Sequence, residues 1–503
     1  MLRPVPRPCR LPATPSPPSH DAIMSPTAHT AHATGSSSAA GPTARPVAPV
    51  YGNVLEMIGN TPLLRITHLD TGPCELFVKM ESMNPGNSIK DRIAISMVLA
   101  AERDGRLKPG GTIIEATAGN TGIALALVAS QKGYRMKVVM PDKMSDEKIS
   151  HLRAMGAEVV LTRSDVAKGH PEYYQDMAER LAKATPNSFY VNQFGNPANP
   201  EAHYTTTGPE IWAQMEGRVD AFVAGVGSGG TVTGVGRFLK EKNPRCEIVL
   251  ADPHGSILAP LVNEGKRIEP GSWLVEGIGE DFVPDILDLS LVDKAYDVTD
   301  GDAFHTAREL LRKEGVLAGS SVGTLLTAAL RYCREQKAPK RVVSLICDSG
   351  AKYLSKMFND FWMIDQGFIE RKSYGDLRDL IARRHEDKQD FTLKMDTPLL
   401  LAIRRMRMFD VSQMVVLDEH EKVAGLIDES DVLLALTHTL ENAQRPVRDF
   451  MTSRLETIRP TASINDLMPI FRADRVAIVA DGDRFYGLIT RIDLINYLRK
   501  QLR

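Results

Sequence analysis

The chain has 503 residues, enough for about three domains at roughly 150 residues each, so its cores need no disulfide or metal for stability. Its 61 Lys and Arg residues nearly balance its 63 Asp and Glu residues, and the net charge of -2 gives no electrostatic reason to expect a nucleic acid or an anionic membrane as partner. No run approaches the roughly 18 apolar residues of a membrane helix, so small-molecule partners are expected.

The five cysteines are scattered and contain no C-x-x-C pair. This odd number argues against a disulfide framework, and the spacing argues against a thiolate metal site. We therefore predict no bound metal and a location in the reducing cytoplasm.

Residues 1–46 form a segment of unusual composition. Eleven of the 31 prolines fall in the first 50 residues, where Asp21 is the only acidic residue and Lys is absent. Such a segment buries too little apolar surface to offset the entropy of ordering. We predict a disordered Pro/Ala/Ser-rich arm.

Residues 47–366 alternate between short apolar runs, Gly-rich turns and helix-like stretches. This α/β pattern predicts parallel-sheet cores covered by helices, with ligands bound beyond the carboxyl ends of the strands. The predicted strands are Thr112–Glu115, Lys137–Met140, Glu158–Leu161, Ala221–Ala224, Glu247–Ala251 and Arg341–Ile346, and the predicted helices include Ile123–Ser130, Ser145–Met155 and Gly234–Lys242.

The first chemical motif places Lys90 in a turn that enters a helix near Asp91. The helix dipole disfavours a positive charge there, which helps to keep the amine neutral and nucleophilic. Taken alone, Lys90 is better explained as a solvated surface lysine, so its chemical interpretation depends on the other motifs.

The second motif, Thr117-Ala-Gly-Asn-Thr-Gly122, follows a predicted strand and precedes an apolar helix. Its small residues let backbone N–H groups approach an anion such as an α-carboxylate, and Asn120 can offer its amide to a neighbouring oxygen. A tight turn without a ligand remains the alternative.

The third motif, Gly225-Val-Gly-Ser-Gly-Gly-Thr231, fits G-x-G-x-x-G, and Asp252 follows near the end of the next strand. This spacing is compatible with a dinucleotide, and therefore with an NAD-dependent oxidoreductase, but also with one terminal phosphate. A fourth Gly-rich bend, Ala318-Gly-Ser-Ser-Val-Gly323, either binds a ligand or merely caps the next helix.

A charged linker is expected at residues 367–390, and an internal repeat follows it. Gly425-Leu-Ile-Asp-Glu-Ser-Asp431 recurs 62 residues later as Gly487-Leu-Ile-Thr-Arg-Ile-Asp493. Two similar units, at 391–445 and 446–503, predict a pseudo-symmetric pair that buries a shared face.

These motifs, in this order, resemble the fold type II pyridoxal-phosphate enzymes of the cysteine synthase and cystathionine β-synthase group. The resemblance also rests on the stretches 193–204 and 207–212, Q-F-G-N-P-A-N-P-E-A-H-Y and T-G-P-E-I-W. It implies a two-lobed catalytic domain with pyridoxal 5'-phosphate as cofactor, and a Schiff base between this cofactor and Lys90.

The resemblance also assigns roles to the remaining site residues. Asn120 would hydrogen-bond the pyridoxal hydroxyl, and Ser321 would meet the pyridine nitrogen. A neutral hydroxyl there does not keep the nitrogen protonated, which favours β-elimination and replacement. The phosphate would be held by Gly227, Ser228, Gly229, Gly230 and Thr231. The substrate carboxylate would be held by Thr117, Ala118, Gly119, Thr121 and Gln193.

Within the group, Asp252–Ile257 and Glu276–Pro284 are more similar to cystathionine β-synthases than to cysteine synthases. The repeat resembles the paired CBS modules (βαββα) of those synthases, which implies an adenosyl ligand, S-adenosylmethionine or an adenine nucleotide, at Thr490 and Asp493. Dimerisation or scaffolding without a ligand is the alternative for this pair. Asp428 replaces the corresponding hydroxyl residue in the first copy, which should be the poorer phosphate site.

Three departures limit what can be carried over. Ala118 stands where many members have Ser, and Glu280 stands where animal enzymes usually have Tyr. Cys9 and His20 lack the Trp-containing context of the haem-binding arm of animal members. We therefore expect no haem.

The resemblance implies β-replacement that joins L-serine to L-homocysteine, giving cystathionine and water, by a homodimer or homotetramer. Three alternatives remain open. A cysteine synthase that uses O-acetylserine and sulfide would share every catalytic residue, an oxidoreductase would use the Gly225–Thr231 loop, and a non-enzymatic adenylate sensor would use the terminal pair alone.

Overall fold

The computed structural model describes residues 49–501 except 118, 143, 145, 167–168 and 389. The expected arm at 1–46 and the site residue Ala118 lie outside the described residues. No helix among the described residues is long and apolar enough to cross a membrane.

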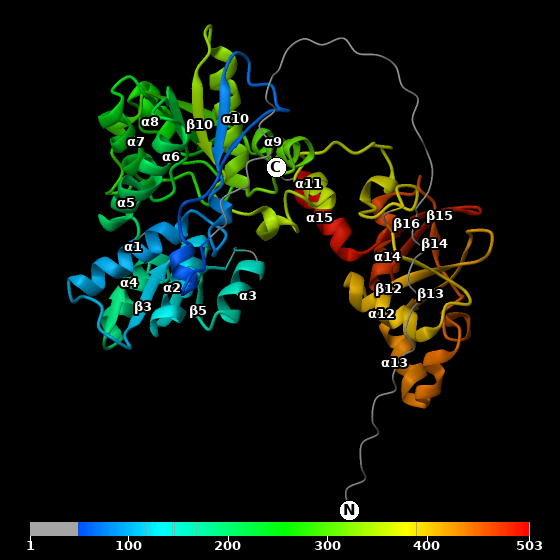
Figure 1. Ribbon diagram of the computed structural model, residues 1–503. Coiled ribbons are helices and arrows are strands. Elements are labelled where there is room, and N and C mark those ends of the chain that lie inside the picture. The colour runs from blue at the N-terminus through cyan, green and yellow to red at the C-terminus, as the bar shows by residue number, and fades with distance from the viewer. Residues whose placement is uncertain are drawn as a thin grey trace, which may run out of the picture. The chain divides into compact units, whose positions relative to one another are not determined.

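The catalytic part contains two sheets, which form the cores of two lobes (Figure 1). The six-stranded sheet is parallel except for its edge strand β1, and the four-stranded sheet is entirely parallel. The larger sheet has the order β1 (Leu63–Arg65), β2 (Glu75–Lys79), β10 (Arg341–Leu345), β7 (Ala221–Ala224), β8 (Glu247–Pro253) and β9 (Lys294–Val298). The smaller sheet has the order β5 (Glu158–Thr162), β4 (Arg135–Pro141), β3 (Thr112–Ala116) and β6 (Ser188–Tyr190).

Helices cover both sheets, as the alternating pattern predicts. The helices α1 to α4 lie with the smaller sheet in one lobe (Figure 1). They are α1 (Lys90–Arg103), α2 (Asn120–Lys132), α3 (Asp146–Ala154) and α4 (Tyr174–Ala184). The others of the catalytic part are α5 (Ala198–Ala202), α6 (Gly208–Gln214), α7 (Gly230–Lys242), α8 (Leu258–Glu264), α9 (Asp300–Glu314), α10 (Ser320–Glu335) and α11 (Asp360–Asp365).

Each sheet has its own apolar core. Parallel strands covered on both faces are largely apolar. All four residues of β7 are buried, as are all five of β3, which include the polar residues Thr112 and Glu115. The core of the larger lobe joins β7 and β8 to α10, whereas that of the smaller lobe joins α1, α2 and β4.

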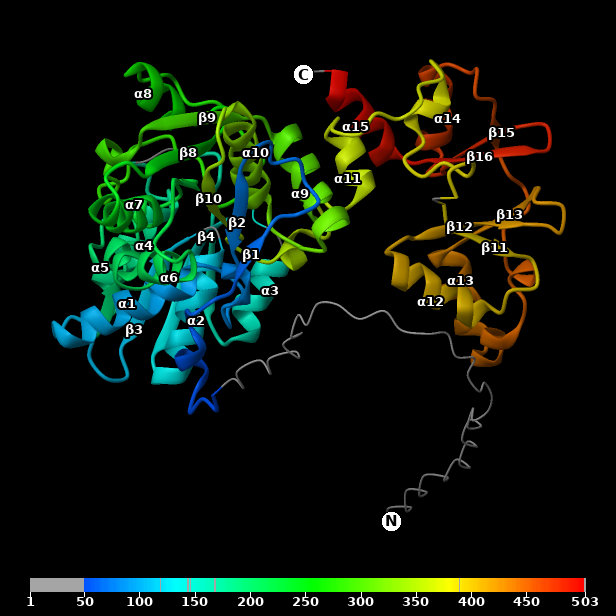
Figure 2. The same cartoon turned by 45° about the horizontal axis from the view of Figure 1, so that its top comes forward.

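The repeat folds as two βαββα units (Figure 2). The first is β11 (Thr392–Lys394), α12 (Leu399–Phe409), β12 (Gln413–Leu417), β13 (Val423–Asp428) and α13 (Glu429–His438). The second is β14 (Thr457–Ile458), α14 (Leu467–Arg472), β15 (Ala477–Asp481), β16 (Arg484–Ile489) and α15 (Arg491–Gln501). Val415 and Leu417 of the first unit pack with Ile478 and Phe485 of the second, so the pair buries a shared face.

Candidate active site

Lys90 is the first residue of α1, and the preceding turn is fixed against the end of β10. The N–H of Ile89 donates to the carbonyl of Cys347 at 2.8 Å. The Lys90 side chain is only partly exposed. Burial lowers the pKa of its amine, and the neighbouring Cys347, Asp348 and Glu280 oppose that shift. Desolvation therefore adds to the helix-dipole effect that the sequence indicates.

The Thr117–Thr121 loop follows β3 and leads into α2, so it lies at the carboxyl end of the smaller parallel sheet. The Thr121 hydroxyl donates to Gln193 Oε1 at 2.7 Å, and Thr117 Oγ1 accepts from the N–H of Gly119 at 3.2 Å. Gly119 has φ of 152°, which favours glycine. The structure thus brings together Thr121 and Gln193, two predicted carboxylate-binding residues far apart in sequence.

Asn120 lies at the start of α2 and contacts two side chains, Asp348 and Lys352, that follow β10 in the sequence. Its amide nitrogen donates to Asp348 Oδ2 at 2.8 Å, and its oxygen accepts from Lys352 Nζ at 2.7 Å. Tyr353 also donates to Asp348 Oδ2, at 2.8 Å, while the buried Oδ1 atom has no partner. These contacts hold the Asn120 amide in one orientation.

The Gly225–Thr231 loop has the shape of a phosphate cradle at the start of α7. A Cβ at Gly227 would lie 2.5 Å from the carbonyl oxygen of Gly277, and one at Gly230 would lie 1.9 Å from Asn199 Oδ1. The Asn199 amide donates to Ser228 Oγ at 2.9 Å, and Thr231 Oγ1 lies 3.2 Å from His203 Nε2. Only glycines allow the backbone this approach, and the loop N–H groups together with the Ser228 and Thr231 hydroxyls fit one phosphate.

Ser321 is buried in the first turn of α10, where its hydroxyl interacts with the Cys347 thiol. Burial raises the pKa of this thiol to about 12, and the Lys90 charge opposes the shift. Lys90, Ser321 and Cys347 therefore share one neighbourhood at the end of β10.

Asp252 does not have the environment of a ribose-binding carboxylate. Its side chain is fully buried, and its Oδ2 accepts from the N–H of Ala259 at 2.8 Å. Burial raises its pKa to about 6. The carboxyl group supports the chain that enters α8, so the dinucleotide interpretation is not favoured.

Sequence reasoning missed several residues of the site. Asn199 and His203 lie in the N-P-A-N-P-E-A-H stretch, which contributes to the resemblance but by itself indicates no role for either residue. Three others follow the interior strand β10: Asp348, Lys352 and Tyr353. Because ligands bind beyond the carboxyl ends of parallel strands, their position after β10 is the sequence signal that could have identified them as site residues.

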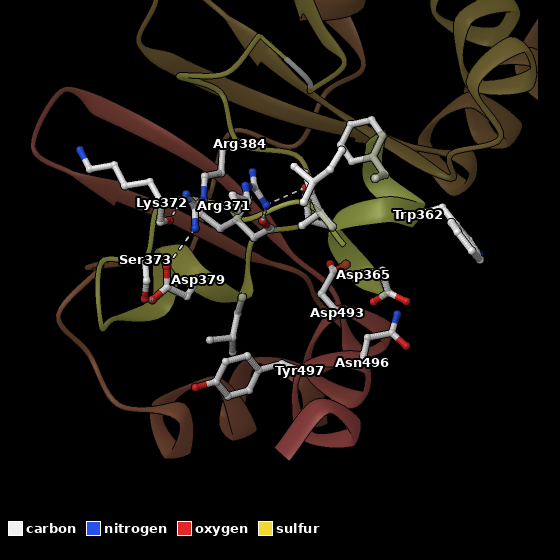
Figure 3. Close-up of a pocket in the computed structure, with 16 residues that line it drawn as sticks. Trp362, Asp365, Arg371, Lys372, Ser373, Asp379, Arg384, Asp493, Asn496 and Tyr497 are labelled. Atoms are coloured by element: carbon white, nitrogen blue, oxygen red, sulfur yellow. Dashed lines mark hydrogen bonds and ion pairs between the residues drawn. The ribbon is translucent and has the colours of Figure 1, made fainter. Parts of the chain in front are cut away.

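In the repeat, Asp493 Oδ2 accepts from the N–H and the hydroxyl of Thr490, at 2.7 and 2.6 Å. Asp493 also lines a cavity of about 450 Å³ between α15 and residues 361–384, where Arg371 and Arg384 contribute cations (Figure 3). Thr490 is not among the described residues that line this cavity. In the first copy, Asp428 occupies the position of Thr490, and its carboxylate accepts from the N–H groups of Ser430 and Asp431.

Comparisons with known proteins agree with this site. The family model "pyridoxal-phosphate dependent enzyme" matches residues 54–348, and the CBS domain model matches 379–438 and 447–500. Cystathionine beta-synthase of Dictyostelium discoideum is 37% identical over 472 residues, 90% of this chain and 93% of that protein. The Saccharomyces cerevisiae enzyme of the same name is 35% identical, with 89% of this chain and 97% of that protein covered.

Solved structures show the same fold. A hydrogen sulfide-producing enzyme from Fusobacterium nucleatum superposes with a TM-score of 0.57 at 41% identity, covering 61% of this chain and all of that one. An O-ureido-L-serine synthase gives 0.58 at 36% identity, covering 65% and 98%. The two-lobed fold and its Lys90 site thus define a fold type II pyridoxal-phosphate-dependent enzyme. Within that class, the chain belongs to the cystathionine beta-synthase family.

Proposed function

We propose that the protein is a lyase that condenses L-serine with L-homocysteine to cystathionine and water. The name of its relatives supports this reaction. The observation that carries the proposal is the position of Lys90, a partly buried amine of lowered pKa. It lies near Asp348, which contacts Asn120 of the carboxylate-type loop, and near His203, which lies 3.2 Å from Thr231 of the phosphate-type loop.

The residues fit pyridoxal phosphate. Gly227, Ser228, Gly229, Gly230 and Thr231 would hold its phosphate. Lys90 would bind its aldehyde carbon, Asn120 its hydroxyl and Ser321 its ring nitrogen. When bound, the cofactor supplies the electron sink that makes the Cα proton of serine acidic.

The chain's own groups then perform the proton transfers. The loop amides near Thr117, Gly119 and Thr121, with Gln193, hold the serine carboxylate and so orient Cα toward Lys90. The Lys90 amine accepts the Cα proton and returns a proton to the departing hydroxyl. The Cβ–O bond breaks, and the hydroxyl leaves as water with that proton. When the Cβ–S bond forms, the thiol proton passes through the Lys90 amine to Cα and restores the Cα–H bond.

Replacement of Lys90 tests this assignment. Lys90→Ala should abolish turnover, whereas Lys108→Ala, at an exposed position beyond α1, should retain it. Borohydride reduction followed by peptide mass analysis should find a pyridoxyl group on the Lys90 peptide of the native enzyme. Normal turnover in Lys90→Ala, or no such adduct, would contradict the proposal.

Substrate competition separates the proposed reaction from cysteine synthesis. Steady-state rates should favour serine over O-acetylserine and homocysteine over sulfide. A strong preference for O-acetylserine with sulfide would instead establish a cysteine synthase with the same site residues.

The terminal pair is proposed to bind an adenosyl ligand in its second half. Thr490 and Asp493 offer a hydroxyl and a carboxylate at the start of α15, which suit phosphate or ribose. In the first half, Asp428 and Asp431 both present carboxylates, and burial together with the Asp428 charge raises the pKa of Asp431. Their negative charge disfavours a phosphate.

The protein is further proposed to act in the cytoplasm as a homodimer or homotetramer. The four cysteines among the described residues are all unpaired, which suits a reducing compartment. Several large apolar side chains are exposed, including Leu99, Leu434 and Leu440, and these suit contacts between subunits. Sedimentation velocity checks the assembly.

A further inference from the structure

The two hydroxyl groups of the phosphate-type loop, those of Ser228 and Thr231, are both contacted from one short helical segment. Asn199 of α5 reaches Ser228, and His203, the first residue of the π-helical turn that follows α5, reaches Thr231. Because Asn199 and His203 are four residues apart, they lie on the same face of that segment. The proposed mechanism gives neither residue a role.

Glycines of α7 let this segment pack closely against the start of the helix. A Cβ on Gly234 would lie 2.2 Å from the carbonyl oxygen of Pro200 and 2.8 Å from Cβ of His203. The side chains that reach the loop are also buried, since Asn199 is fully inaccessible and His203 is 2% exposed. Their contacts are therefore made away from bulk water, where a hydrogen bond is electrostatically stronger.

The orientation of the Asn199 amide follows from its partners. Asn199 Nδ2 lies 2.8 Å from the backbone carbonyl oxygen of Gln193, which can only accept, and 2.9 Å from Ser228 Oγ. The atom that faces both must be the nitrogen, which donates one hydrogen to each. Ser228 Oγ has no other hydrogen bond within the described part of the chain. Its own hydrogen is thus left to donate to a ligand.

The tautomer of His203 follows from a second hydroxyl group. Its Nδ1 lies 2.9 Å from Thr207 Oγ1, and its Nε2 lies 3.2 Å from Thr231 Oγ1. Burial lowers the pKa of the imidazole well below its usual value, so the ring is neutral and one nitrogen donates while the other accepts. Among the described residues, the fully buried Thr207 hydroxyl has no acceptor except Nδ1. Thr207 therefore donates to Nδ1, and Nε2–H donates to Thr231 Oγ1.

Building on the proposed function, we propose that Asn199 and His203 are positioning residues that turn the hydroxyl hydrogens of Ser228 and Thr231 toward the cofactor phosphate. Each hydroxyl oxygen accepts an N–H from the helical segment, which leaves its hydrogen for a phosphate oxygen. A phosphate dianion only accepts hydrogen bonds, and it would repel a hydroxyl that presented a lone pair. The two residues therefore prepare the loop for an anion.

The contribution of His203 is measured by titrating the full chain, prepared without its cofactor, with pyridoxal phosphate and with pyridoxal, which lacks the phosphate. His203→Leu should raise the Kd for pyridoxal phosphate about ten- to hundredfold, as expected for a lost hydrogen bond to a charged group, and change that for pyridoxal less than about twofold. His203→Gln keeps a nitrogen donor near the place of Nε2 and should restore much of the affinity. His438→Leu, at an exposed position of α13, is the matched control and should change neither Kd.

A double-mutant cycle separates hydroxyl orientation from packing. In a Thr231→Val background no hydroxyl is left to orient, so adding His203→Leu should weaken the binding of pyridoxal phosphate by less than about twofold. A purely structural role would weaken it by the same factor in both backgrounds. That result overturns the proposal, as does an unchanged Kd or an equal effect of His203→Leu on pyridoxal and pyridoxal phosphate.

Asn199→Asp tests the other hydroxyl without removing a heavy atom. The oxygen that replaces Nδ2 carries at most one hydrogen, and the Gln193 carbonyl requires it. Ser228 must then donate to this oxygen, so its hydrogen turns away from the phosphate. The Kd for pyridoxal phosphate should rise at least about tenfold, and most of this rise should disappear in a Ser228→Ala background. An unchanged Kd, or a rise that persists without the hydroxyl, contradicts the proposal, and this variant decides it if His203→Leu does not fold.

Failure of the proposed function has a different signature. If the native chain binds no pyridoxal phosphate, the cofactor assignment itself is wrong. If the native holoenzyme binds the cofactor but joins serine to no thiol, the proposed reaction is wrong, and the Kd values of His203→Leu and Asn199→Asp still decide the role of these two residues.

Discussion

Glu115 is a fully buried carboxyl group beneath the carboxylate-type loop. Its Oε1 accepts from the N–H of Gln193 at 3.3 Å, and its buried Oε2 has no partner. Burial raises its pKa to about 8, although hydrogen bonds from Gln193 and Asn192 oppose the shift. The folded protein therefore keeps this group protonated at a pH at which the unfolded chain has released the proton.

The consequence is a loss of stability as pH rises. Between the unfolded pKa near 4.5 and the folded pKa near 8, the folded state binds more protons. Glu115 alone then lowers the free energy of unfolding by up to ~1.4 kcal/mol per pH unit. Glu115→Gln should remove this slope and raise the stability increasingly above pH 5, as measured by urea unfolding at several pH values.

The exposed Glu419 provides a control for this measurement. Glu419→Gln should leave the pH dependence of native stability unchanged. If Glu115→Gln has the same slope as the native protein between pH 5 and 8, Glu115 is ionised in the folded state and the prediction is wrong.

Sequence reasoning identified site residues that occur within contiguous motifs. Lys90, Asn120 and the Gly227–Thr231 loop each follow a local signal of strand, small residues and helix. Lys148 forms an ion pair with Glu276, 128 residues away, and neither lies in a motif that indicates the other. Their pairing depends on how the two lobes meet, and no local pattern specifies that.

At the scale of elements, the backbone conformation at the start of α7 determines how tightly the cofactor phosphate can be bound. Gly230→Ala places a Cβ where Asn199 Oδ1 now lies, so the loop must shift. We expect pyridoxal phosphate to bind at least about tenfold more weakly, because each displaced loop amide is a charge-assisted hydrogen bond to phosphate. Equilibrium dialysis with absorbance of the bound cofactor measures this change.

Gly236, in the same helix, is the matched control. A Cβ there would meet no atom closer than 3.6 Å, and alanine favours helix by about 1 kcal/mol relative to glycine. Gly236→Ala should therefore retain cofactor affinity. Equal cofactor loss in both variants would show that the cradle is not responsible.

The start of α1 is held by a buried ion network. Arg92 pairs with Glu81 and Glu210, both at 2.7 Å, and Lys79 Nζ lies 2.7 Å from Glu210. Arg92→Met leaves Glu81 without a cation partner, which should cost about 3–5 kcal/mol of unfolding free energy in guanidinium titrations. Arg103→Met, on the exposed end of α1, should change it by less than about 0.5 kcal/mol.

The predicted strands of the two catalytic sheets all form, with ends displaced by a few residues. Lys137–Met140, for example, extends to Arg135–Pro141. The strands that sequence reasoning missed are β1, β2, β6 and β9. Two of these, β1 and β6, have only three residues, and β2 completes its sheet by pairing with β10, more than 250 residues away. Strands β2 and β6 therefore form because of partners that are distant in sequence.

At the scale of the whole molecule, the two halves of the repeat have the same fold but different chemistry. In each half, an aspartate in the first turn of the helix after the hairpin, Asp431 or Asp493, accepts from the N–H of the residue that precedes the helix, Asp428 or Thr490. At the residue before that helix, only the second half has a hydroxyl, that of Thr490, because the first half has Asp428 there. The internal symmetry therefore does not imply two equivalent ligand sites.

This asymmetry predicts one adenosyl ligand per chain rather than two. Isothermal titration of the holoenzyme with S-adenosylmethionine should give a stoichiometry near one, and Thr490→Val should weaken binding by about tenfold through the lost hydroxyl. Ser430→Ala, at an exposed position in the first half, should have no effect. Two equivalent sites would show that the first half also binds the ligand, and weakening by Ser430→Ala alone would place the ligand in the first half. Either result would contradict the assignment, because the first half would then bind the ligand beside Asp428 and Asp431 and without the hydroxyl that Thr490 supplies.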